Sequence, residues 1–93
     1  MKSIDTVLDV VAEGMGVDRA SILAPSRGVK KLAWARQVAM YLYHGGHRSW
    51  SEVGRVFERD RTTVRHAVAK VRANMTGEVL AMEARLARTA PSV

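Results

Sequence analysis

The sequence predicts an all-α fold, a compact helical domain that contains a helix-turn-helix. Apolar residues recur at the i, i+3, i+4, i+7 spacing of helices over most of the chain, and glycines, prolines and capping residues separate these stretches. No segment shows the period-two alternation of a strand. With 93 residues, 47% of them hydrophobic, the chain has enough apolar surface for one core. We therefore expect a single domain over residues 1–88 and a disordered tail over 89–93.

The first quarter of the sequence predicts a long helix followed by a short one. Ser3 can cap the first helix, and we expect Gly14 and Gly16 to end it. Asp18 can cap a short helical turn, which Pro25 stops. A polar, basic loop then leads to the centre of the chain.

The remaining helices follow from composition and capping signals. Residues from about 29 to 43 lack Gly and Pro and are rich in helix formers, which predicts a central helix. Ser49 with Glu52 forms a capping-box pattern at the start of a two-turn helix, and Asp60 can cap the next one. The sequence thus predicts a helix-turn-helix at about 49–72. We expect that run to end at Thr76-Gly77.

A last amphipathic helix is expected over 78–88. Its apolar stripe of Val79, Met82 and Leu86 either covers the core or contacts a second copy of the chain or another protein. We interpret Trp34 and Trp50 as packing residues, because single-stranded nucleic-acid sites need several exposed aromatics.

Positive charge is concentrated in the middle of the sequence. The whole chain carries +6, but residues 27–72 carry eleven Lys or Arg against three acids, a net charge of +8, and the rest carries −2. A charge that served solubility alone would be spread over the surface. The distribution indicates a polyanion partner, and nucleic acid is the leading candidate.

The segment after Asp60 has the pattern of a helix that lies in the major groove. Its valines share one side, whereas Thr62, His66 and Ala69 share the opposite side. Cationic residues flank that outer side. The N-terminus of the helix favours a bound anion. An arginine there can read guanine, and Asp60 can accept from cytosine. The candidate DNA contacts in this segment are Arg59, Asp60, Arg61, Thr62, Thr63, Arg65, His66 and Lys70.

These residues resemble the C-terminal DNA-binding domain of the bacterial replication initiator DnaA, which has a Trp-repressor-like architecture. Ala35-Arg-Gln-Val-Ala-Met-Tyr-Leu42 is similar to that domain's central-helix motif, and Glu52-Val-Gly54 followed by Arg59-Asp60-x-Thr62-Thr63-Val64-x-His66-Ala67 is similar to its helix-turn-helix signature. The resemblance covers nearly the whole chain to about residue 75.

The resemblance implies roles for particular residues. It assigns base reading to Asp60 and Thr62, and phosphate contacts to Thr63, Arg36 and Gln37. It also implies a basic loop that enters the minor groove, and Arg27, Lys30 and Lys31 lie in the corresponding loop.

The chain departs from the family pattern at the residues that select the DNA sequence. Arg61 stands where the family has histidine, Gly28 lies near the expected minor-groove arginine, and Trp34 replaces a residue that is commonly basic. The turn at Glu58 is one residue shorter. The sequence also lacks the Gly-x-x-x-x-Gly-Lys-Ser/Thr loop of the initiators' ATPase, so we expect no ATP-driven filament.

Other function classes find little support in the sequence. The chain has no cysteine, and His44, His47 and His66 do not form a zinc pattern, so we expect no metal and no cofactor. The capping box explains Glu52, and no catalytic triad or carboxylate pair is present, so we expect no enzyme and no small-molecule substrate. No signal peptide or membrane segment is indicated, which predicts a cytoplasmic, nucleoid-associated protein.

We therefore expect a sequence-specific double-stranded DNA-binding protein that acts as a transcriptional regulator. Two alternatives remain open: a replication accessory that competes for initiator boxes, and an adaptor whose helix at 78–88 recruits RNA polymerase or a replication or recombination factor.

Overall fold

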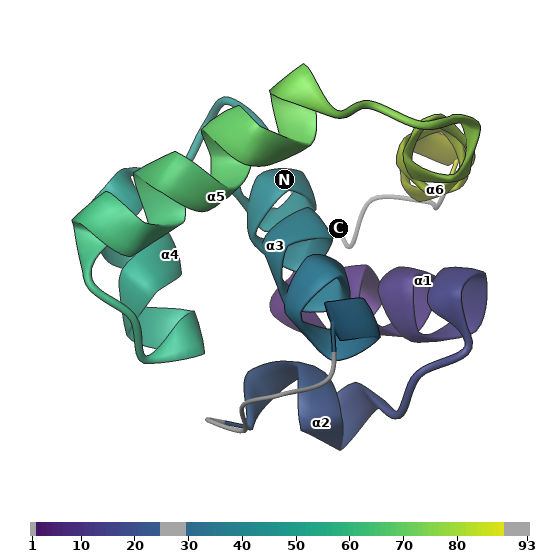
Figure 1. Ribbon diagram of the computed structural model, residues 1–93, viewed down its shortest axis with the longest axis horizontal. Helices are drawn as coiled ribbons and strands as arrows, with labels where there is room; N and C mark the ends of the chain where they lie inside the picture. Colours follow the sequence, from purple (N-terminus) through teal and green to yellow (C-terminus); the bar gives the residue numbers. More distant parts are fainter. Residues whose placement is uncertain (1, 25–29, 89–93) are drawn as a thin grey trace.

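The computed structural model describes residues 2–24 and 30–88, and these residues form helices joined by short turns (Figure 1). The helices are α1 (Ile4–Met15), α2 (Arg19–Leu23), α3 (Lys30–His44), α4 (Trp50–Phe57), α5 (Arg61–Ala73) and α6 (Gly77–Arg88). No strand occurs in the described residues, so the all-α prediction is confirmed. None of these helices is both long and apolar enough to cross a bilayer.

Helix α3 forms the centre of the fold. It packs against α1, α2, α4 and α5, which lie around it in Figure 1. Buried residues occur on several sides of α3, as expected for a helix with neighbours all round. They are Ala35, Arg36, Val38, Ala39, Met40 and Leu42. The central helix therefore connects the N-terminal helices to the helix-turn-helix.

Three helix starts follow the capping signals of the sequence. The Ser3 and Asp60 side chains accept hydrogen bonds from the backbone N–H of Thr6 and Thr63, and Ser49 with Glu52 makes a complete capping box. Asp18 occupies the cap position of α2 but makes no side-chain bond to the helix backbone. Side-chain caps therefore fix the starts of α1, α4 and α5.

The prediction that Gly14 helps to end the first helix was wrong. Gly14 lies inside α1, and Gly16 alone ends the helix, in a left-handed conformation with φ 65°. A Cβ at Gly14 would lie 2.7 Å from the Met82 Cγ and Sδ atoms. The missing side chain therefore serves the close approach of α6 and not the end of α1.

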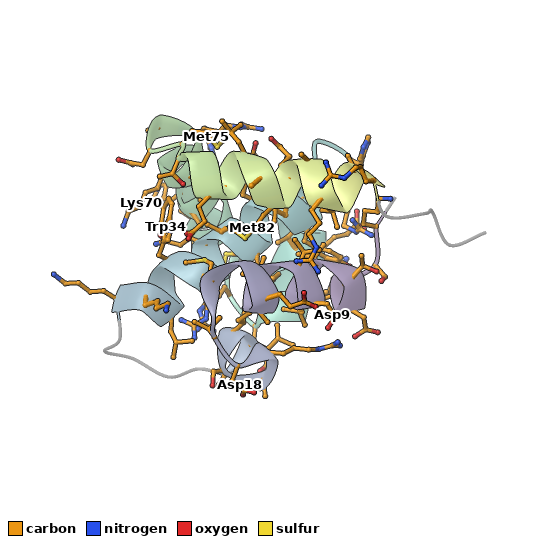
Figure 2. The ribbon with its side chains drawn as sticks, turned by 90° about the vertical axis from the view of Figure 1, so that its right-hand side faces the viewer. Asp9, Asp18, Trp34, Lys70, Met75 and Met82 are labelled. Atoms are coloured by element: carbon orange, nitrogen blue, oxygen red, sulfur yellow. The ribbon has the colours of Figure 1, made fainter. Side chains whose placement is uncertain are left out.

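The end of α5 also differs from the prediction. Helix α5 stops at Ala73, and Thr76-Gly77 belongs to the start of the next helix, where the Thr76 hydroxyl accepts from the Val79 N–H. Figure 2 shows α6 alongside α1 with Met82 between them. The predicted stripe is buried, with Val79 0%, Met82 3% and Leu86 6% exposed. Of the two roles considered for the stripe, it therefore covers the core.

Candidate nucleic-acid interface

Helices α4 and α5 are joined by a tight turn that closes on Gly54. The backbone N–H groups of Glu58 and Arg59 both donate to the Gly54 carbonyl, the latter at 2.9 Å, and Glu58 takes the left-handed conformation with φ 53°. A Cβ at Gly54 would lie 2.4 Å from the Arg59 carbonyl oxygen. The closeness of the turn therefore depends on the absence of a side chain at Gly54.

Helix α5 presents one buried and one exposed face. Val64, Val68 and Val71 are completely buried, and Ala67 is 5% exposed. The opposite face is exposed, and it carries the hydroxyl, imidazole and cationic groups that the sequence places there. Its exposed residues are Arg61, Thr62, Arg65, His66, Ala69 and Lys70. The outer side of α5 is thus an open surface and is not packed inside the fold.

The start of α5 combines a hydrogen-bonded anion with exposed polar groups. The Asp60 Oδ1 atom accepts from the Thr63 N–H at 2.8 Å. This backbone hydrogen bond is the main cause that lowers the pKa of Asp60, with a further contribution from the Thr63 hydroxyl. Arg61, Thr62 and Thr63 lie exposed beside it. Asp60 therefore stays ionised and can act as a hydrogen-bond acceptor at the N-terminal end of α5.

A hollow of about 260 Å³ lies between α3 and α5, and it brings together residues that are far apart in the sequence. Three cations line it and no carboxylate does. The predicted site residues in its lining are Arg36, Gln37, Arg59, Thr63, His66 and Lys70. This arrangement creates a positive potential that suits a phosphate group.

Arg36 has a structural role that the sequence analysis missed. The side chain is only 8% exposed; its Nε donates to the Ile22 carbonyl at 2.8 Å, and its Nη2 donates to the Ala24 carbonyl at 2.7 Å and the Ser21 carbonyl at 3.2 Å. Burial lowers the pKa of Arg36, and the nearby Arg59 lowers it further. The guanidinium therefore ties the last turn of α2 to α3, and its contact with phosphate stays a prediction.

A signal for this role was present in the sequence. Arg36 lies four residues before Met40, which is 2% exposed, on the same side of the helix. An arginine aligned with a buried apolar residue needs internal acceptors for its N–H groups.

The other predicted cations on α3 lie at its start. Lys30 and Lys31 are exposed in the first turn, where the helix dipole disfavours cations. Gln37 lines the hollow, and its Oε1 atom is buried without a hydrogen-bond partner in the described part of the chain. Arg27 lies outside the described residues.

The residues weighed as alternatives have other surroundings. The His44 ring stacks on the Trp50 indole with centroids 4.2 Å apart, so Trp50 is a packing residue, and Trp34 packs against the core. Among residues 2–24 and 30–88, no three His, Asp or Glu side chains gather as metal ligands.

A capped short helix, a glycine-dependent tight turn and a second helix with an exposed, cation-edged face define the helix-turn-helix class of DNA-binding domains. Within this class, the chain belongs to the family described as bacterial dnaA protein helix-turn-helix, whose model matches residues 4–71.

Relatives of the chain support the same assignment. It is 44% identical over 70 residues to a protein of Xanthobacter autotrophicus, 44% over 72 residues to one of a Bradyrhizobium species, and 41% over 69 residues to one of a Synechococcus species. Each relative is named chromosomal replication initiator protein DnaA. The matches cover 72–75% of this chain but only 14–15% of the relatives' length.

Proposed function

We propose that the chain binds double-stranded DNA at specific sequences and acts there as a transcriptional regulator. Occupying a duplex that overlaps a promoter needs only binding, so the proposal includes no catalytic step. The exposed outer face of α5 is the observation that carries it. Thr62 and His66 lie at its centre, and Arg65 and Lys70 lie at its edges. A helix in the major groove needs hydrogen-bonding groups over the bases and cations beside the phosphates.

We assign base reading to the start of α5. Asp60 is held ionised by the Thr63 N–H, so it can accept a hydrogen bond from the amino group of cytosine. Arg61 is exposed and can donate to both acceptors of a guanine, and Thr62 lies next to it. Each such contact contributes about 1–3 kcal/mol to the choice of base.

We assign backbone contacts to the hollow between α3 and α5 and to the start of α3. Lys70, Thr63 and the amide NH₂ of Gln37 are the donors that a phosphate at the hollow would meet. Lys30 and Lys31, which are exposed in the first turn of α3, and Arg27, which precedes them in the sequence, are further candidates for backbone contacts. The role of Arg36 in this scheme is to hold α2 and the wall of the hollow in place.

Selection of bound duplexes from a random pool tests the proposal directly. The expected result is enrichment of a short sequence. The logarithm of the binding constant should fall with the logarithm of the salt concentration, with a slope of about −0.9 for each phosphate that the protein neutralises. A pool that stays random after several rounds contradicts sequence-specific binding.

Matched variants separate the two kinds of contact. Arg61→Ala and Thr62→Ala should change which sequence is enriched, whereas Lys70→Ala should weaken all duplexes alike and reduce the salt slope by about one contact. Arg55→Ala is the control, because Arg55 is exposed on α4 and lies outside the hollow. Equal loss of selectivity from Lys70→Ala and Arg61→Ala would contradict these roles.

A second candidate function follows from the names of the relatives, which are replication initiators. In this function the chain occupies initiator boxes at an origin and competes there. Footprints on an origin and on promoters of the same genome distinguish the two: protection confined to the origin supports the replication role, and protection of promoters supports the regulator.

A further inference from the structure

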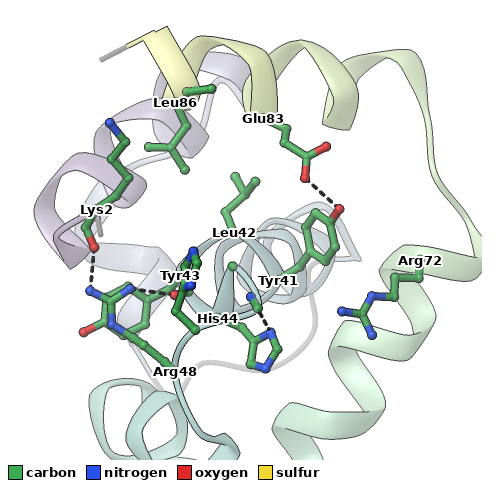
Figure 3. Close-up of a pocket in the computed structure, with 13 residues that line it drawn as sticks. Lys2, Tyr41, Leu42, Tyr43, His44, Arg48, Arg72, Glu83 and Leu86 are labelled. Atoms are coloured by element: carbon green, nitrogen blue, oxygen red, sulfur yellow. Dashed lines mark hydrogen bonds between the residues drawn. The ribbon is translucent and has the colours of Figure 1, made fainter. Parts of the chain in front are cut away.

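A second hollow, of about 440 Å³, lies at the C-terminal ends of α3 and α5 (Figure 3). Arg72 lines this hollow, whereas Lys70 lines the one between α3 and α5. Residues two positions apart lie on nearly opposite flanks of a helix, so the two hollows are on different sides of α5. None of the DNA contacts assigned above involves the second hollow.

The interior of this hollow is mainly apolar. Leu42 and Leu86, each 6% exposed, line it from α3 and α6. The Tyr41 ring lies beside them, and its hydroxyl donates to the Glu83 Oε2 atom at 2.8 Å. Figure 3 shows Leu42, Tyr41 and Leu86 around the same opening. A ligand that fills this volume therefore needs an apolar body.

One guanidinium at the hollow is occupied and another is not. Arg48 donates to the Tyr43 carbonyl at 2.8 Å and to the Lys2 carbonyl at 2.6 Å, and it lies over the Tyr43 ring. Arg72 makes no ion pair with a carboxylate in the described part of the chain. Its planar donors remain available for a carboxylate, which they can bind with two parallel hydrogen bonds.

We propose that this hollow binds a small monocarboxylic acid with an aromatic or branched aliphatic body. Arg72 takes the carboxylate, and the body lies on Leu42 and Leu86. The volume falls within the roughly 300–1,000 Å³ of small-molecule sites, which are mostly apolar with a few placed polar groups. Glu83 in the lining repels a doubly charged phosphate more strongly than a singly charged carboxylate, because the repulsion between like charges scales with the charge of the ligand.

The position of the hollow relates it to the helix-turn-helix. Arg72 belongs to α5, and His44, which also lines the hollow, stacks on Trp50 at the start of α4. A ligand in the hollow would therefore contact a residue of α5 and a residue that packs against the start of α4. The inference does not depend on the proposed DNA function, because its test measures ligand binding alone.

Titration of the full chain with phenylacetate, followed by heteronuclear NMR, tests the proposal. Phenethylamine and inorganic phosphate serve as parallel probes, the first with the same ring and opposite charge and the second with an anion and no apolar body. We expect saturable shifts at the Leu42 and Leu86 methyl groups and at the Arg72 Nε–H with phenylacetate only. No saturable shift, or equal shifts with all three probes, would overturn the proposal.

Two variants and one control make the test specific. Arg72→Gln should weaken the affinity for phenylacetate by about tenfold or more, since the substitution removes a charged bidentate contact. Ala87→Phe, at an exposed position in the lining, should block binding by filling the hollow. Arg55→Gln removes the same charge from α4 and should leave the affinity unchanged.

Two further results would overturn the proposal. The first is unchanged phenylacetate affinity in folded Arg72→Gln. The second is a set of shifts at these residues caused by duplex DNA but not by phenylacetate, which would make the hollow a groove for the DNA backbone.

Discussion

Replacing Gly54 by alanine adds one methyl group at the point where the helix-turn-helix is tightest. The added Cβ would lie 2.4 Å from the Arg59 carbonyl oxygen and 3.6 Å from the Asp60 carbonyl carbon. Backbone atoms cannot rotate away as the end of a flexible side chain can. The turn must therefore open, which weakens the 2.9 Å hydrogen bond from the Arg59 N–H to the Gly54 carbonyl.

Three contributions set the size of the effect. Overpacking of this kind costs about 1–3 kcal/mol. A weakened hydrogen bond adds about 1 kcal/mol. The better helix propensity of alanine returns about 1 kcal/mol. The free energy of unfolding should thus fall by about 1–3 kcal/mol, and at roughly 4–8 °C per kcal/mol for a domain of this size the Tm should fall by roughly 5–20 °C.

Thermal unfolding followed by far-ultraviolet circular dichroism measures this change, with Gly77→Ala as the control. Gly77 also lies in a helix, but a Cβ added there meets nothing within 4 Å, so the control should unfold at or slightly above the temperature of the unmodified chain. If Gly54→Ala were as stable as Gly77→Ala, the turn would not be closed on Gly54 as described, and the argument would fail.

Three further changes test other parts of the structure. Glu58→Gly should raise the free energy of unfolding by about 0.5–1 kcal/mol, because the left-handed conformation at Glu58 strains any residue with a Cβ; a lower urea midpoint would contradict this. Arg36→Ala should cost about 3 kcal/mol by leaving the carbonyls of α2 unpaired, and loss of duplex binding without loss of stability would argue instead for a direct phosphate contact. Burial, then Arg72, lowers the pKa of His44 below 6.5, and its Nδ1 accepts from the Gly46 N–H. Protonation of His44 therefore favours the unfolded chain. The stability of the fold should be kept above about pH 6.5, the reference pKa of histidine, and should fall as the pH drops below it. Between pH 7.5 and about 5.5, the urea midpoint of His44→Gln should change less than that of the unmodified chain.

Local signals in the sequence predicted most of the helix boundaries. The capping box of Ser49 and Glu52 acts between residues three positions apart, so its geometry is settled within one turn of helix. The cap at Asp60 and the left-handed Gly16 are local in the same sense. The outer face of α5 was also predictable, because the 3.6-residue period fixes which residues share a side once Val64 is known to be buried.

Contacts between distant segments escaped the same reasoning. The role of Gly14 depends on Met82, which reaches it from α6, and no local pattern near Gly14 contains that information. The hollow between α3 and α5 depends likewise on how the two helices cross, because it joins Gln37 to Lys70. The periodicity of each helix predicts its faces but not the partner that each face meets.

Arg36 shows how this distinction affects the reading of binding experiments. The same side chain lines the hollow that we assign to a phosphate and donates to the Ile22 and Ala24 carbonyls of α2. Loss of duplex binding in an Arg36 variant would therefore report the position of α2 as well as any phosphate contact. Lys70 lines the same hollow, is exposed and belongs to α5, so its removal changes the charge without releasing α2. The salt dependence of Lys70→Ala is thus the measurement that isolates the electrostatic contribution of the hollow, whereas Arg36→Ala tests the position of α2 and any phosphate contact together.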